Sequence, residues 1–256
     1  SKIENNAFEE CISLINVKVP QGPTEIGAKA FRNCSNLSDI NFPEGLIAIG
    51  ESAFEGCSNL ASVKFGKGLV QIGNGAFLGC GKLAEIELPE GLTTLGPNTF
   101  GGCSSLAGIR IPKGITSIEG GTFTGCTRLA KVEFSEGLET IGRSAFRGCS
   151  SLTDITLPEG LTTINGDAFA ECSNLKNVTL PESLTMIDGN AFADCSSLES
   201  IRLPGKLKSL GAHSFFRCGN LRSIELPDSL TEIGGEHFGF CSKLEGINLP
   251  DGICSI

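Results

Sequence analysis

Twelve cysteines and two histidines are the residues of this 256-residue chain that could carry distinctive chemistry. Eleven of the cysteines recur every 23 residues from Cys11 to Cys241, and each follows a phenylalanine by three positions, from Phe8 to Phe238. Cysteines in this number are usual in disulfide-bonded scaffolds and in metal sites. The regular spacing decides between these chemistries and a purely structural role.

The spacing argues against disulfides. A strict period predicts a stack of identical coils, each touching only its neighbours. Cysteines stacked in register lie about 4.8 Å apart with parallel side chains, whereas a disulfide needs Cβ atoms about 3.8 Å apart that point toward each other. We therefore expect a buried ladder of reduced thiols. Cys254 falls outside the series, and we expect it to be exposed.

The sequence predicts no catalytic residue, cofactor, metal site or small-molecule substrate, and the chain is not expected to be an enzyme. Its only histidines, His213 and His237, fall at non-equivalent positions of adjacent coils. This placement suits neither a catalytic triad nor a spaced metal site. Cys218 and Cys241 lie near them in sequence, but both belong to the expected buried ladder.

One repeat unit shows which elements must position these residues. Alternating apolar and polar residues predict a short strand at 154–157, and Pro158 ends it because proline donates no backbone hydrogen bond. Leu161 and Ile164 then point inward from a second extended stretch. Residues 167–172 are expected to form one or two turns of helix with their apolar side chains on one face.

A position usually occupied by Gly, Asn or Asp precedes the expected helical turns, as at Gly50, Gly142, Asn165 and Asp188, whereas Glu119 takes it in one coil. These residue types tolerate a left-handed backbone, which we expect at this position. His237 directly precedes Phe238 and occupies the position that other coils fill with a small residue such as Ala168.

The repeat L-x-x-I-x-L-P-x-x-L-x-x-I-G-x-x-A-F-x-x-C resembles the BspA-like, or Treponema-type, leucine-rich repeat over essentially the whole chain. The resemblance implies an α/β solenoid: a right-handed, curved stack of about eleven 23-residue coils. A parallel β-sheet would line the concave face and short helical turns the convex face. The resemblance also implies binding without catalysis, by proteins that are common as adhesins on bacterial and protist surfaces.

Composition limits the classes of partner that the chain is expected to bind. The net charge of −9 argues against nucleic acid, whose phosphates require clustered cations, and no apolar run reaches the roughly 18 residues of a membrane span. A protein partner is expected instead. Residues 1–256 are expected to form a single solenoid domain, and the lack of polar capping repeats suggests that it belongs to a longer chain.

The outward column of the predicted strands alternates in sign over four coils, at Lys64, Glu87, Arg110 and Glu133. Either these residues pair with one another across neighbouring strands, or they form a charge-patterned groove for a protein. A column of small and polar residues, which includes Asp154, lies beside it.

Two further surfaces interrupt the uniform pattern. Glu136, Glu159 and Glu182 form a run of carboxylates after the strands, interpreted as a solvated edge or as a site for a basic partner or cation. Phe216 and Phe240 replace small or polar residues and are expected to be exposed, as a contact site or as cover over the last coils.

The favoured hypothesis is a non-enzymatic protein-binding module for recognition or adhesion, surface-exposed or secreted. The alternative is a structural scaffold or spacer subunit of a larger, intracellular assembly, which the uniform coils would also suit.

Overall fold

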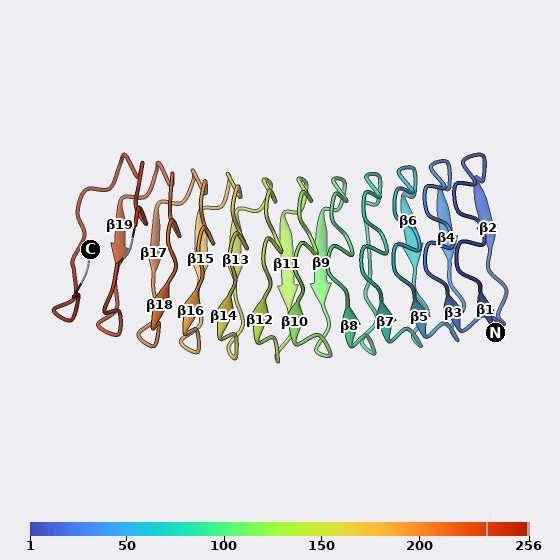
Figure 1. Ribbon diagram of the computed structural model, residues 1–256, viewed down its shortest axis with the longest axis horizontal. Coiled ribbons are helices and arrows are strands. Elements are labelled where there is room, and N and C mark those ends of the chain that lie inside the picture. The colour runs from blue at the N-terminus through green and yellow to red at the C-terminus, as the bar shows by residue number, and fades with distance from the viewer. Residues whose placement is uncertain (234, 255–256) are drawn as a thin grey trace.

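The computed structural model describes residues 1–233 and 235–254, which form an elongated β-solenoid of about ten turns. The coils lie in a row along the long axis, with the two ends of the chain at opposite ends of the stack (Figure 1). Most coils contribute short parallel strands, and these strands form two rows. The predicted solenoid with parallel strands is confirmed.

The long-strand row carries the alternating strand predicted from the repeat. Its members have three or four residues, and in most of them the central side chain points into the core. They are β2 (Asn16–Lys18), β4 (Asp39–Asn41), β6 (Ser62–Lys64), β9 (Gly108–Ile111), β11 (Lys131–Phe134), β13 (Asp154–Thr156), β15 (Asn177–Thr179), β17 (Ser200–Arg202) and β19 (Ser223–Glu225).

The short-strand row corresponds to the second extended stretch of each repeat. Its members have two residues, of which the second points inward. They are β1 (Lys2–Ile3), β3 (Glu25–Ile26), β5 (Ala48–Ile49), β7 (Gln71–Ile72), β8 (Thr94–Leu95), β10 (Ser117–Ile118), β12 (Thr140–Ile141), β14 (Thr163–Ile164), β16 (Met186–Ile187) and β18 (Ser209–Leu210).

The strands pair in parallel with an offset of one repeat, as in Ile155 with Val178 and Ile141 with Ile164. This register places the same position of every repeat in one column, so inward-facing residues stack on their equivalents. The short-strand row forms two five-stranded sheets, whereas the long-strand row is divided into one three-stranded and three two-stranded sheets.

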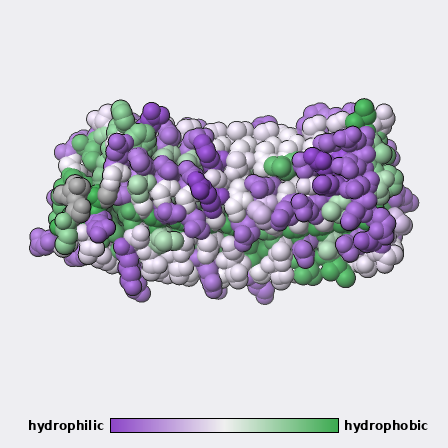
Figure 2. All heavy atoms as spheres, viewed as in Figure 1, coloured by the Kyte–Doolittle hydropathy of each residue, from purple (hydrophilic) through white to green (hydrophobic). Residues whose placement is uncertain are grey.

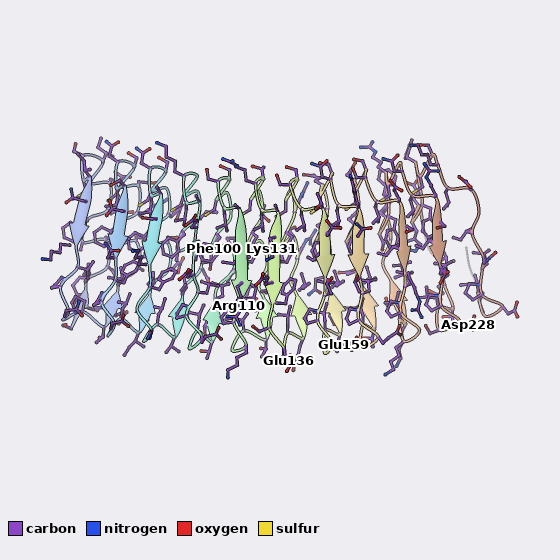
Figure 3. All side chains as sticks on the ribbon, turned by 180° about the vertical axis from the view of Figure 1, so that it is seen from behind. Phe100, Arg110, Lys131, Glu136, Glu159 and Asp228 are labelled. Carbon is purple, nitrogen blue, oxygen red and sulfur yellow. The ribbon has the colours of Figure 1, made fainter. Side chains whose placement is uncertain are left out.

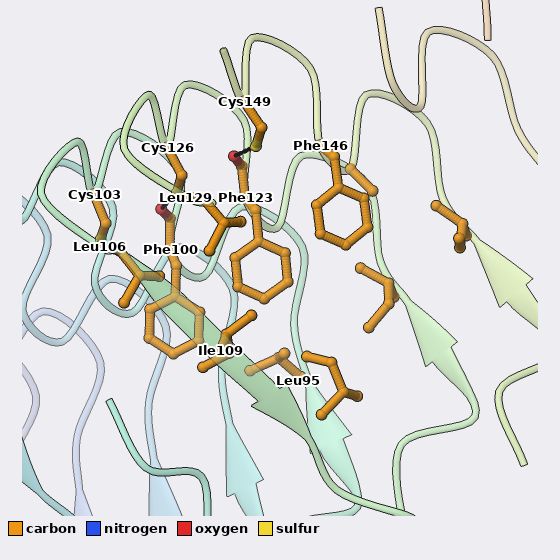
Figure 4. Close-up of a cluster of buried hydrophobic side chains, with 14 of the residues drawn as sticks. Leu95, Phe100, Cys103, Leu106, Ile109, Phe123, Cys126, Leu129, Phe146 and Cys149 are labelled. Carbon is orange, nitrogen blue, oxygen red and sulfur yellow. Dashed lines mark hydrogen bonds between the residues drawn. The ribbon is translucent and has the colours of Figure 1, made fainter. Parts of the chain in front are cut away.

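A phenylalanine spine runs through the core. Its rings stack almost parallel, as for Phe100 on Phe123 at 5.8 Å and Phe123 on Phe146 at 5.2 Å between centroids (Figure 4). Nine of these phenylalanines have no exposed surface: Phe31, Phe54, Phe77, Phe100, Phe123, Phe146, Phe169, Phe192 and Phe215. The spine is less complete than expected at both ends, because Phe8 in the first coil is 40% exposed and Phe238 in the last coil is only partly buried.

The cysteine ladder lies beside the spine, and its residues from Cys34 to Cys241 are buried and free. Each of these thiols donates a hydrogen bond to the carbonyl oxygen of the phenylalanine 26 residues earlier, as Cys126 does to Phe100 at 3.1 Å (Figure 4). The prediction of buried, reduced thiols is confirmed for these residues. It is wrong for Cys11, which is exposed, while Cys254 is exposed as expected.

The segment from Gly27 to Cys34 shows why the expected helical turns are absent from the described residues, where turns take their place. Its amides alternate between two kinds of acceptor. Phe31 N–H donates to Ala53 of the next coil at 2.8 Å, whereas Cys34 N–H donates to Phe31 within the coil at 3.2 Å. Positive φ angles at Lys29 and Asn33, of 55° and 58°, prevent helical propagation. Equivalent segments form the turn row of the solenoid.

The glycine position before the turn row was also misinterpreted. Gly50 does not have a positive φ; left-handed residues follow it, at Ser52 and Gly56. A Cβ at Gly50 would lie 2.6 Å from the backbone nitrogen of Ala28 in the preceding coil. Close approach of two backbones, rather than turn geometry, therefore favours glycine at position 50, while Asn165 and Asp188 occupy the equivalent position in other coils.

Candidate partner-binding surface

The outward side chains of the long-strand row form the strand face, which contains the alternating charges. Arg110 and Glu133 are register neighbours on β9 and β11. However, the guanidinium of Arg110 pairs with Glu90 Oε1 at 2.6 Å, and Glu133 pairs with Lys131 on its own strand. The hydrogen bond and charge of Lys131 lower the pKa of Glu133.

The other two members of the predicted ladder, Lys64 and Glu87, form no ion pair within the described part of the chain. The interpretation as a self-pairing ladder of salt bridges is therefore wrong. Arg110 instead reaches a glutamate of the column that follows the strands. Lys64 and Glu87 both remain exposed on the strand face.

Asp154 lies in the small and polar column beside these charges. Its carboxylate accepts hydrogen bonds from the hydroxyl of Thr153, at 2.6 Å, and from the side-chain amide of Asn177. These two hydrogen bonds lower the pKa of Asp154, with that from Thr153 the larger cause. The carboxylate is thus fixed in its ionised form on the strand face.

The carboxylates that follow the strands lie along one edge of the solenoid, where Figure 3 shows Glu136 and Glu159 side by side. Glu182 is held by Arg202 at 3.6 Å and by the amide of Gly205 at 3.3 Å. Glu136 and Glu159 make no ion pair among the residues described here. No group of three or more His, Cys, Asp or Glu suited to hold a metal ion occurs in residues 1–233 and 235–254.

The two unusual phenylalanines contact each other on the turn row of the last coils. Phe216 and Phe240 meet edge to face at 5.3 Å, and Phe240 is 71% exposed while Phe216 is half-buried. The guanidinium of Arg217 lies 5.2 Å and 5.7 Å from the two ring centroids. The expected exposure is confirmed for Phe240 and wrong for Phe216, and Arg217 was not among the residues predicted from the sequence.

Exposed large apolar side chains occur near the two ends of the stack, and Figure 2 shows apolar atoms there with hydrophilic side chains between. They are Phe8, Ile12, Ile15, Ile47 and Val70 toward the N-terminus, and Phe240 and Leu249 toward the C-terminus. The strand face between them is polar. It therefore suits a partner recognised through charge and hydrogen bonding more than one recognised through apolar area alone.

The fold and this polar strand face define a leucine-rich-repeat solenoid. The family described as BspA type Leucine rich repeat region (6 copies) matches residues 1–130, 93–219 and 139–256. The chain belongs to this family.

Three solved structures place the chain among bacterial relatives. It is 29% identical to a leucine-rich repeat protein from Bacteroides ovatus, over 98% of this chain and 82% of that one, with a TM-score of 0.53. It is 34% identical to the T. pallidum Leucine Rich Repeat protein, over 62% of this chain and 72% of that one, with a TM-score of 0.56.

The third solved structure is that of a leucine rich cell surface protein from Faecalibacterium prausnitzii. It is 25% identical over 97% of this chain and 82% of that one, with a TM-score of 0.52. A comparison with curated proteins gave no match. Among the described residues, the structure has no helix long and apolar enough to cross a membrane.

Proposed function

We propose that this protein is a non-enzymatic recognition module that binds a protein partner through its strand face, at the cell surface or after secretion. The observation that supports this proposal most strongly is that two charged side chains of the strand face are exposed and unpaired among the described residues. Lys64 and Glu87 lie exposed on a regular surface without an ion-pair partner among the described residues. They are thus available to a partner without breaking an internal salt bridge.

The geometry of the strand face supports the same proposal. Parallel strands hold Lys64, Arg110 and Glu133 in a fixed column, so most of the charge pattern is pre-organised and a partner need not order it. The adjacent column is small and polar, with Ser62 and Gly108 beside the charged residues, and allows close approach. The surface location is supported by the relative from Faecalibacterium prausnitzii that is described as a cell surface protein.

Site-specific photocross-linking tests this proposal. A photoreactive phenylalanine at position 133 would lie on the strand face, and one at the exposed position 139 would lie beside the short-strand row. Incubated with the extracellular fraction of the source organism, the variant at 133 should give a discrete cross-linked protein and the variant at 139 should not. Cross-linking from 139 alone would place binding on another surface and contradict the proposal.

A structural scaffold subunit remains the second candidate. The observation that favours it is the uniform offset of one repeat in every strand pairing, which leaves no elaborated loop for selective recognition. A scaffold would co-purify from the cell interior with the same partners at fixed stoichiometry. A surface module would instead be labelled on intact cells by a membrane-impermeant biotin reagent.

A further inference from the structure

A groove of about 1060 Å³ opens on the strand face where the long-strand row is interrupted. It is lined by residues of three successive coils, from Ser62 to Gly108. Phe65 and Leu88, both half-buried, contribute apolar surface to it. This volume lies just above the range of about 300–1,000 Å³ that is usual for ligand sites. The groove lies on the strand face, so an inference from it rests on the proposed function and locates the binding site within that face.

The backbone within the groove has unused hydrogen-bonding capacity. The coil between β6 and β9 forms no strand in the long-strand row, and Glu85 makes only an isolated bridge with Ser62. The amides and carbonyls of Ile86, Glu87 and Leu88 make no backbone hydrogen bond within the described chain. Extended chains are recognised through such unpaired main-chain groups, together with pockets for their side chains.

The charges that line the groove fall into two rows of opposite sign. Lys64 and Lys67 come from one coil, and Glu85, Glu87 and Glu90 come from the next. Among the residues described, only Glu90 in this group forms an ion pair, with Arg110. A ligand that carried a single sign of charge would be repelled by one of the rows. The pattern therefore fits a ligand with both signs.

We propose that this groove binds an extended peptide segment of a partner protein in which an acidic, an apolar and a basic residue follow one another at every second position, so that their side chains point to the same face. The acidic side chain meets Lys64 and Lys67, and the basic side chain meets Glu85 and Glu87. The apolar side chain rests on Phe65 and Leu88. The peptide backbone hydrogen-bonds to the free groups of residues 86–88. Ala107 and Gly108 leave room for its main chain at the far side.

Three labelled seven-residue peptides test the proposal by fluorescence anisotropy. Each has a central leucine, one charged residue two positions before it and one two positions after it, with glycine at the other positions and blocked termini, so that all three side chains share one face. The charged residues are Asp and Lys, two Asp, or two Lys. The wild-type protein should prefer the Asp–Lys peptide. Lys64→Glu with Lys67→Glu should weaken that peptide about tenfold, a change of about 1.4 kcal/mol, and create a preference for the two-Lys peptide.

Glu85→Lys with Glu87→Lys should create the opposite preference, for the two-Asp peptide. A variant that merely unfolds cannot gain affinity for a new peptide, so these gains separate specificity from stability. The matched control is Arg202→Glu with Glu225→Lys, a register pair on β17 and β19 of the same face. It should leave all three affinities unchanged.

Equal affinity of the wild type for all three peptides, or no binding, would overturn the proposal. So would loss of the preference in the control variant. A concentration-dependent dimer in light scattering that Lys64→Glu with Lys67→Glu abolishes would assign the groove to a second copy instead. Failure of this peptide proposal is distinguishable from failure of the proposed function. Cross-linking from position 133 on β11 reports on partner binding whether or not these peptides bind.

Discussion

The thiol of Cys149 donates a hydrogen bond to the carbonyl oxygen of Phe123, 26 residues earlier, at 3.3 Å. The same contact joins each successive pair of coils from Cys34 to Cys241. Each cysteine thus fills core volume and also satisfies a backbone acceptor of the preceding coil. The period of the sequence gives these residues a structural role in place of redox or metal chemistry.

Thiol reactivity should divide the cysteines into two classes. Burial raises the pKa of Cys57, Cys126 and Cys172 to about 12, so at pH 8 only about one in ten thousand of these three thiols is ionised. Burial also raises the pKa of the other ladder cysteines from Cys34 to Cys241. Cys11 and Cys254 are exposed. In the native protein a chromogenic disulfide reagent should therefore react rapidly with these two, and with all twelve cysteines in guanidinium.

The variant Cys11→Ser with Cys254→Ser is the control and should show no rapid reaction. A ladder cysteine that reacts as fast as Cys11 in the folded protein would contradict the buried assignment.

The phenylalanine spine should carry much of the stability. Phe123 has no exposed surface and stacks on a ring on each side, so Phe123→Ala should reduce the free energy of unfolding by about 3–5 kcal/mol. Phe240→Ala, at a ring that is 71% exposed, should cost under about 1 kcal/mol. Urea denaturation monitored by circular dichroism measures both. Equal losses for the two variants would refute the distinction between spine and surface rings.

The repeat period was enough to predict the solenoid and the inward columns, because stacking in register places equivalent residues on one another. The strand predicted at 154–157 is present as β13, which ends one residue earlier, at Thr156. Helical turns were predicted wrongly because the spacing of Ala168, Phe169 and Cys172 fits a helix face equally well. The alternation of hydrogen-bond acceptors between coils leaves no trace in side-chain types. Positive φ angles at Lys29 and Ser52 cannot be inferred from those two residues alone. However, Gly75, Asn98 and Asn190 in the same column are of types that tolerate this backbone and could have indicated it.

The strand face was predictable in its columns but not in its pairings. Adjacent charges in a column suggested Arg110 with Glu133, yet an arginine side chain is long enough to reach another column and binds Glu90. The groove depends on where the long-strand row loses its pairing around Ile86. That feature arises from the path of the backbone, which the alternation of apolar and polar residues does not specify.

The glycine at position 50 should be intolerant of even a methyl group. A Cβ there would lie 2.6 Å from Ala28 N and 2.8 Å from the carbonyl carbon of Gly27, and rigid backbone cannot move away as a side chain could. Gly50→Ala should therefore reduce the free energy of unfolding by about 1–3 kcal/mol. Gly45→Ala is the matched control, since no atom lies within 4 Å of its Cβ and its φ is not positive. It should be neutral or stabilise by up to about 1 kcal/mol.

Acid should destabilise the C-terminal coils through His237. Its side chain is 2% exposed, and neither ring nitrogen has a hydrogen-bond partner in the described structure. Burial, followed by the charge of His213, lowers the pKa of His237 from 6.5. As the pH falls below 6.5, the unfolded chain takes up a proton that the folded chain does not, so stability is lost until the pH reaches the lowered pKa.

His237→Ala, which restores the small residue found at Ala168, should flatten this acid-side loss, while His213→Ala at the half-buried neighbour should change it less. The measurement is the melting temperature of the three proteins from pH 8 to pH 5. The carboxylates contribute equally to the pH dependence of all three, because the proteins differ only at a histidine. If the curves of the wild type and of His237→Ala ran parallel through this range, the buried imidazole would not be the group that titrates. A parallel shift of the two curves would then report only the packing difference between imidazole and methyl at this position.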